Sequence, residues 1–161
     1  MEDDEGDGTM KDFDYYIFID YSENLIGYAI IEDEKLKELL PNLTRFKHYR
    51  SSGDRMSYLR HIKKTIERDD IKSFFLKLKI KEMRKNMEIH LDVLEFLKTH
   101  ENCIIFISVD NSQYSAFRKM VNIVDGKDIM IKQESELKEG TPEYQVSLVL
   151  DNLLNIERLR K

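Results

Sequence analysis

The sequence is poor in cysteine and has no long apolar run, and both absences limit where the protein works. Cys103 is the only cysteine among the 161 residues, so the chain cannot close an internal disulfide. A single cysteine favours a reducing cytoplasm. No uninterrupted apolar stretch approaches the ~18 residues of a membrane helix, and the N-terminus is acidic, whereas a signal peptide begins with positive charge. We therefore expect a cytoplasmic protein that has no membrane partner.

Several nucleotide-binding and metal-binding motifs are also missing. The six glycines form neither a Walker loop nor a dinucleotide-binding fingerprint. The four histidines are scattered, and no two of them are four residues apart, as zinc-binding pairs on a helix are. Cys103 has no companion motif and lies in an apolar segment, which favours a core position over a nucleophile. These absences exclude the commonest nucleotide-binding loops and a zinc site built on a histidine pair.

The composition is that of a globular chain with an acidic beginning. Hydrophobic residues make up 41% of the sequence, enough for a core, and charged residues make up 35%, above the usual quarter. Abundant Lys, Glu and Ile without Trp are typical of a thermophile. Residues 1–12 are acidic and have no hydrophobic pattern. We therefore expect a disordered tail over residues 1–12 and a single domain over residues 13–161.

The charge is unevenly distributed along the chain. The net charge of −5 argues against nucleic-acid binding through bulk charge. The first fourteen residues are strongly acidic, however, and the remainder is nearly balanced. Residues 61–84 are rich in Lys and Arg. Such a segment is either a surface for a phosphate backbone or a solvated helix face, and we favour the solvated face because exposed helix faces are commonly charged. The charge pattern still permits a nucleic-acid partner.

The apolar pattern predicts an α/β protein with a mixed sheet flanked by helices. The expected strands are Tyr15–Asp20 and Leu25–Ile31 in a hairpin, Leu43–Tyr49 at an edge, Cys103–Asp110 at the centre, and Lys127–Gln133. The expected helices are 54–66, a long helical region over Ile71–Thr99 that is either one kinked helix or two, Ser112–Val121 and a final helix that begins at Pro142. Glu32–Leu40 is either a short helix or an exposed edge. An extended helical segment thus precedes the central strand.

Three aspartates stand on elements that would hold them rigidly. Asp20 closes the first strand, Asp110 closes the central strand, and Asp151 lies within the apolar final helix. Carboxylate oxygens are the ligands that Mg²⁺ and Mn²⁺ prefer, and two such ions can clamp the attacking and leaving oxygens of a phosphodiester. The alternatives are that Asp20 and Asp110 only begin turns, or that Asp151 belongs to a polar stripe with Ser147 and Asn155 that faces water.

The order of elements and these acids resembles the ribonuclease H-like superfamily. That fold has a hairpin-led mixed sheet, aspartates on the first and fourth strands, an acid on the first long helix and an acid on the last helix. Asp20, Asp110 and Asp151 match three of these positions by order and by element.

A shorter resemblance concerns the first strand. Ile-Asp-Tyr-Ser-Glu at residues 19–23 resembles the Ile-Asp-Glu-Ser-Gly opening of a poorly characterised prokaryotic family within the superfamily. That family also ends in a Ser-containing loop followed by a helix with a central Asp, for which residues 134–136 and 144–151 are the counterparts. The sequence departs from the family at Tyr21, where the family has its second acid, and at Glu23, where it has Gly.

The resemblance implies a metal-dependent nuclease that hydrolyses phosphodiester bonds in DNA or RNA. Asp20, Asp110 and Asp151 would hold Mg²⁺ or Mn²⁺, and the helical acid would be Glu88, with Asp92 as the alternative. The competing hypothesis is an inactive relative, because a fold does not by itself confer activity. Such a relative would serve as a homodimeric interaction module or a nucleic-acid-binding module, with residues 54–99 as its interface.

Overall fold

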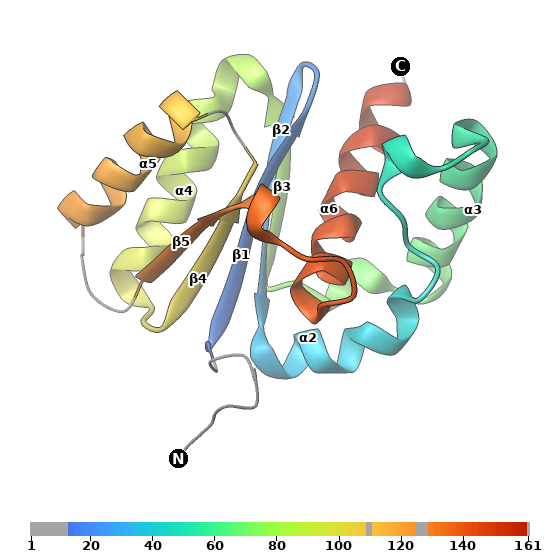
Figure 1. The fold of residues 1–161 in the computed structure, drawn as a ribbon, viewed down its shortest axis with the longest axis horizontal. Helices are drawn as coiled ribbons and strands as arrows, with labels where there is room; N and C mark the ends of the chain where they lie inside the picture. Colours follow the sequence, from blue (N-terminus) through green and yellow to red (C-terminus); the bar gives the residue numbers. More distant parts are fainter. Residues whose placement is uncertain (1–12, 109–110, 125–128, 161) are drawn as a thin grey trace.

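A computed structural model describes residues 13–108, 111–124 and 129–160 (Figure 1). Within these ranges, five strands form one mixed sheet in the order β3-β2-β1-β4-β5. The strands are β1 (Tyr15–Ser22), β2 (Leu25–Glu32), β3 (Lys77–Glu82), β4 (Cys103–Ile107) and β5 (Ile129–Gln133). β2 pairs antiparallel with β1 and β3, whereas β4 pairs parallel with β1 and β5. The expected acidic tail over residues 1–12 and the expected metal ligand Asp110 lie outside the described residues.

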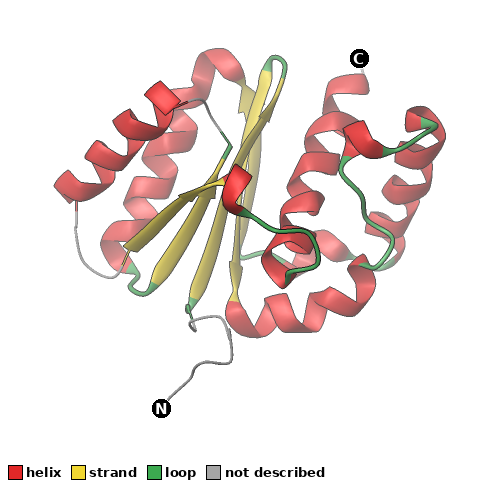
Figure 2. Cartoon of the chain, viewed as in Figure 1, coloured by secondary structure: helices red, strands yellow, loops and turns green. Residues whose placement is uncertain are grey.

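Helices cover both faces of the sheet (Figures 1 and 2). The helices are α2 (Asp33–Leu39), α3 (Arg55–Arg68), α4 (Asn86–Thr99), α5 (Asn111–Val124) and α6 (Pro142–Leu159). α4 and α5 lie on one face, while α6 lies on the other, with α2 and α3 outside it. The prediction of a mixed sheet flanked by helices is therefore confirmed.

The alternation of side chains along β1 divides the core into two halves. Tyr16 and Phe18 pack with the apolar side chains of α6, whereas Ile17 and Ile19 pack on the other face with α4. Because successive strand residues point to opposite faces, Asp20 continues the row of Tyr16 and Phe18 and faces α6. The fold thus presents the first-strand acid to the last helix.

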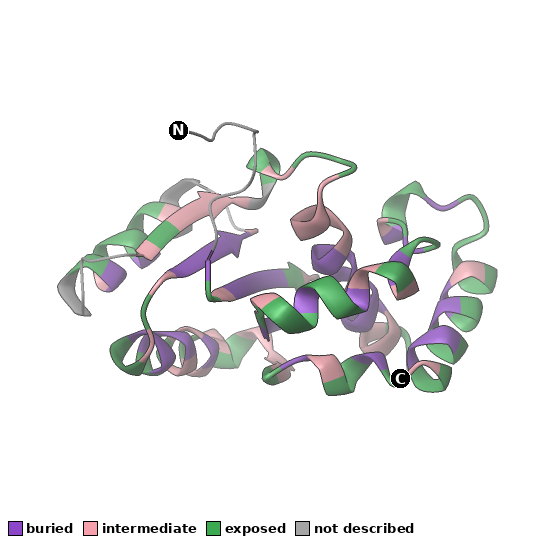
Figure 3. Ribbon diagram, turned by 90° about the horizontal axis from the view of Figure 1, so that it is seen from below, coloured by how far each residue is buried: buried purple, intermediate pink, exposed green. Residues whose placement is uncertain are grey.

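α6 is buried on nearly all sides along its middle turns. Every residue from Val146 to Asn155 is buried, because the sheet covers one side of the helix and the segment from α2 to α3 covers the other (Figure 3). Thr141 caps the helix by accepting a hydrogen bond from the Tyr144 N–H, and Pro142 occupies its first turn, as the sequence predicted. A helix enclosed in this way can hold polar groups away from water.

The expected location of the edge strand is wrong. Residues 43–49 form no strand, and the helix expected over Ile71–Thr99 is interrupted by β3 at Lys77–Glu82. β3 alternates Lys with Leu78 and Ile80, which is the period of a strand with one buried face. Leu78 and Ile80 pack against the core beside α6, and α3 ends before Asp70, which has a φ of 50°. The charged residues of β3 and its short length concealed this pattern within an apparently helical segment.

None of the helices within the described ranges is long and apolar enough to cross a membrane.

The thiol of Cys103 is predicted to be inert in the folded protein. Cys103 begins β4 and is fully buried, and burial, with a smaller effect from the charge of Asp14, raises its pKa to about 12. Only a thiolate attacks a disulfide reagent. We therefore expect the native protein to react with Ellman's reagent at the rate at which it unfolds, with full reaction in denaturant. Fast stoichiometric labelling of the native protein would contradict the placement of Cys103 in the core.

Candidate functional site

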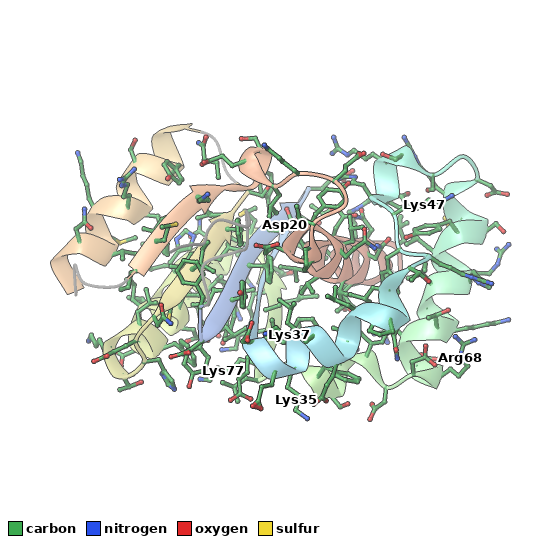
Figure 4. All side chains as sticks on the ribbon, turned by 60° about the horizontal axis from the view of Figure 1, so that its bottom comes forward. Asp20, Lys35, Lys37, Lys47, Arg68 and Lys77 are labelled. Carbon is green, nitrogen blue, oxygen red and sulfur yellow. The ribbon has the colours of Figure 1, made fainter. Side chains whose placement is uncertain are left out.

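Asp20 is a buried carboxylate on the face of β1 that is covered by α6 (Figure 4). It is 6% exposed, and its Oδ1 accepts a hydrogen bond of 2.8 Å from the N–H of Tyr21. Across the hairpin it pairs with Gly27, where an added Cβ would lie 3.4 Å from Cδ1 of Leu150 on α6. The Ser108 N–H donates to the Ile19 carbonyl at 2.9 Å, so the chain leaving β4 passes beside Asp20.

Asp151 is the second buried carboxylate on this side of the sheet. It is 7% exposed, and its Oδ2 accepts a hydrogen bond of 2.9 Å from the N–H of Tyr49. The Nε2 of His48 lies 3.4 Å from its Oδ1. Burial raises the pKa of Asp151, while the Tyr49 N–H and the charges of His48 and Arg50 oppose that rise. Because Ser147, Asp151 and Asn155 are all buried, the alternative of a polar stripe facing water is wrong.

The segment around Tyr49 fixes the outer side of α6. Tyr49 begins the short helix η2 (Tyr49–Ser51), and the His48 Nδ1 accepts the Arg50 N–H at 3.3 Å. The Asn152 side chain of α6 donates to the Lys47 carbonyl at 3.0 Å. Sequence reasoning missed His48 and Tyr49 as neighbours of Asp151, because they are about a hundred residues away and share no local spacing with it. Only the tertiary fold brings them together.

Glu88 and Asp92 lie on α4, which covers the opposite face from α6. The Glu88 carboxylate contacts Lys79 at 3.0 Å and Lys81 at 3.6 Å, and Asp92 accepts from Lys79 at 2.6 Å and from the Tyr28 hydroxyl at 3.2 Å. The structure therefore brings both acids to β3 and does not place them with Asp151. A role for Glu88 in catalysis stays a prediction.

The cluster of Lys79, Glu88 and Asp92 gives a pH-dependent contribution to stability. The hydrogen bond from Lys79 holds the pKa of Asp92 below its usual range. A carboxyl with a lowered pKa in the folded state stabilises the fold above its unfolded pKa of about 3.9, and this stabilisation is lost as the pH falls through the folded pKa. We therefore expect Asp92→Asn to lower the free energy of unfolding at neutral pH by less than about 1 kcal/mol, since the pair is partly exposed.

The difference from the wild type should disappear once the pH falls below the lowered pKa of Asp92 in the folded protein, where both proteins carry a neutral side chain. Urea unfolding at neutral and acid pH measures it. Glu101→Gln is the matched control, because Glu101 is exposed and forms no ion pair within the described residues. If Asp92→Asn remains less stable than the wild type by the same amount at acid pH, the ion pair is not the source of the difference in unfolding free energy.

Four of the eight Lys and Arg residues of the segment 61–84 pair with nearby acids. Arg68 contacts Asp69 at 3.0 Å, Lys79 and Lys81 contact Glu88, and Arg84 contacts Glu82 at 2.8 Å. These pairings support the solvated, charged surface that the sequence favours for this segment.

The described residues supply two oxygen-donor side chains from facing elements, Asp20 on β1 and Asp151 on α6. Their chemistry suits a hard divalent cation. Among residues 13–108, 111–124 and 129–160, no group of three His, Cys, Asp or Glu side chains is arranged to hold a metal ion. The third expected ligand, Asp110, follows β4 outside these ranges. The role of Asp110 as a ligand therefore stays a prediction.

Comparison with known proteins identifies the fold but no close relative. No protein-family model matches the sequence, and no curated protein matches it. The crystal structure of ribonuclease H2 from Pyrococcus horikoshii OT3 superposes with a TM-score of 0.52 at 10% sequence identity, covering 91% of this chain and 72% of that chain. The chain therefore has a ribonuclease H-like fold, as its sequence predicted.

Proposed function

We propose that this protein is a divalent-metal-dependent nuclease that hydrolyses phosphodiester bonds in DNA or RNA. The observation that supports it most is the presence of two buried carboxylates, Asp20 and Asp151, on the two elements where a ribonuclease H-like site is expected. Removing a carboxylate from water is costly unless the group is paired or coordinated. Two such groups on one side of a sheet are better explained by function than by stability.

The proposed site assigns a separate task to each described acid. Asp20 is held rigidly by the sheet, one of its oxygens accepts from the Tyr21 N–H, and the chain leaving β4 passes beside it. Asp151 is oriented by the Tyr49 N–H and His48. Asp110 would complete the set from the segment after β4. Mg²⁺ or Mn²⁺ bound there would activate water and stabilise the leaving oxygen.

A second candidate function is a nucleic-acid-binding or homodimeric module without hydrolysis. Two observations favour it. Both oxygens of Asp151 already contact Tyr49 and His48, as expected of a carboxylate with a structural role. Met87 and Leu91 lie one turn apart on α4 and are about half exposed, which suits a contact between two copies of the chain.

A cleavage assay separates the two functions. The full chain would be incubated with labelled single-stranded and double-stranded DNA and RNA and with an RNA–DNA hybrid, in Mn²⁺, in Mg²⁺ and in EDTA. The nuclease predicts products that require metal, and calorimetry should show Mn²⁺ binding that is lost in Asp110→Asn. Nucleic-acid binding without cleavage of any substrate would favour the module instead. Light scattering of wild type and Met87→Lys would then test the homodimer.

A further inference from the structure

We infer that a pocket beside Asp151, lined by Arg50, Arg55 and Arg158, binds a phosphate group of the nucleic-acid strand. This arginine pocket has a volume of about 410 Å³, within the ~300–1,000 Å³ typical of small-molecule sites. The three arginines come from η2, from the first turn of α3 and from the end of α6. The inference rests on the proposed action on nucleic acid and adds where the strand is held.

The charge of the arginine pocket is unbalanced. Glu23 is the one carboxylate that lines it among the described residues; its side chain is 66% exposed and lies 3.4 Å from Arg158. The Arg50 guanidinium makes no ion pair and no side-chain hydrogen bond within those residues. If the buried Asp151, whose charge interacts with that of Arg50, is counted as well, three guanidinium groups face two carboxylates and leave a net positive charge in a concave site. Arginine forks match phosphate oxygens in geometry as well as in charge.

Two of the arginines are held in place before any ligand arrives. The guanidinium carbons of Arg55 and Arg158 lie 5.5 and 5.8 Å from the centre of the Tyr49 ring, within cation–π range. Arg158 also donates to the Asn155 Oδ1 at 2.9 Å and to the Ser22 Oγ at 3.2 Å. Like charges gathered around one ring repel each other, and a bound anion would relieve that repulsion. Preorganised groups also lose less entropy on binding.

The arginine pocket is joined to the candidate site through one residue. Tyr49 contributes its ring to the pocket, and its backbone N–H donates to the Asp151 carboxylate. Asn155 lines the pocket one helical turn after Asp151, and Ser22 lines it two residues after Asp20 on the same face of β1. A phosphate held by the arginines would therefore place the adjoining part of its strand next to both carboxylates.

The chemistry recognised is a phosphate group, which a strand offers either at its 5′ end or along its backbone. Binding would be measured by fluorescence anisotropy in EDTA, with two short single-stranded oligonucleotides labelled at the 3′ end. One carries a 5′-phosphate and the other a 5′-hydroxyl. Because EDTA removes divalent metal, the measurement does not depend on hydrolysis. The variant is Arg50→Gln with Arg55→Gln, which leaves the Arg158 contacts with Ser22 and Asn155 intact.

We expect the double variant to bind about tenfold more weakly than wild type and to reduce the slope of log affinity against log salt by about 1. Arg60→Gln with Arg68→Gln, two exposed arginines of α3 outside the pocket, removes the same charge and should change affinity less than about twofold. Glu23→Gln should tighten binding about two- to threefold, because it removes the carboxylate that competes for Arg158.

The outcomes separate the pocket from the nuclease. If the wild type prefers the 5′-phosphate oligonucleotide and the double variant loses that preference, the pocket binds a terminal phosphate. If the double variant loses the same affinity for both oligonucleotides, the pocket binds a backbone phosphate. Either result supports the pocket. Equal weakening by the two arginine pairs, or weaker binding in Glu23→Gln, would overturn it. Circular dichroism would confirm that each variant is folded. If the wild type binds through the pocket but cleaves no substrate, the nuclease proposal is rejected and the pocket proposal is kept.

Discussion

Replacing Asp20 by Asn is expected to lower the rate of phosphodiester cleavage by at least about 10²-fold, with the fold preserved. Asn has nearly the same shape, and its Oδ1 can still accept the hydrogen bond of 2.8 Å from the Tyr21 N–H. The substitution therefore removes the negative charge and leaves the geometry of β1 in place. If Asp20 is a ligand of Mg²⁺ or Mn²⁺, the loss of that charge removes its value as a ligand.

The measurement compares single-turnover cleavage rates with affinities for the same substrate. Affinity should change little in Asp20→Asn, because in our proposal the phosphate contacts come from the arginine pocket and not from Asp20. Thermal stability should stay close to that of the wild type, since Asn keeps the hydrogen bond with the Tyr21 N–H. Asp69→Asn is the control, because Asp69 pairs with Arg68 at the far end of α3. If folded Asp20→Asn cleaves as fast as the wild type, Asp20 is not part of the catalytic site.

The parts of the site that the sequence predicted are those that local pattern determines. Asp20 stands in the apolar run that becomes β1, and Asp151 is surrounded by the apolar residues of α6. A short apolar run flanked by turn residues predicts a buried strand, and an acid within an apolar helix is conspicuous. The mixed sheet flanked by helices follows from the apolar pattern and the ribonuclease H-like resemblance, and the comparison of structures confirms it at the level of fold.

The parts that the sequence did not predict depend on contacts between distant segments. Lys79 and Glu88 both fall in the helical region expected over Ile71–Thr99, whereas they come from β3 and α4 and meet across the turn between them. The alternation in β3 covers six residues, which is too short to outweigh the helical pattern on either side. Arg50 and Arg158 meet beside Tyr49 although about a hundred residues separate them. No spacing rule within one element could have grouped them.

The second large effect is expected at Gly27, where a side chain would meet the neighbouring strand. A Cβ at this position would lie 2.9 Å from the Lys79 carbonyl oxygen, 3.0 Å from Cγ1 of Ile80 and 3.4 Å from Cδ1 of Leu150. The first of these atoms is backbone and cannot move without shifting β3. Gly27→Val should therefore lower the free energy of unfolding by about 2–4 kcal/mol, which corresponds to about 5–15 °C in Tm for a chain of this size.

Gly27→Ala gives a measurable intermediate if the Val variant does not fold, and Gly53→Ala is the matched control. A Cβ at Gly53 would meet nothing within 4 Å, so its stability should change by less than about 0.5 kcal/mol. Urea unfolding of the three variants measures the series. Equal stability of Gly27→Ala and Gly53→Ala would contradict the close packing of β3 and α6 against Gly27.

The effect of Gly27 should extend to catalysis, because Gly27 is the register partner of Asp20. Any shift that makes room for a Cβ moves β2 relative to β3 and α6, and β1 follows β2 through the hairpin. Under conditions where Gly27→Ala is fully folded, we expect slower cleavage at unchanged oligonucleotide affinity, whereas Gly53→Ala should cleave like wild type. Slower cleavage without weaker binding would show that the position of Asp20, rather than the amount of folded protein, limits the reaction.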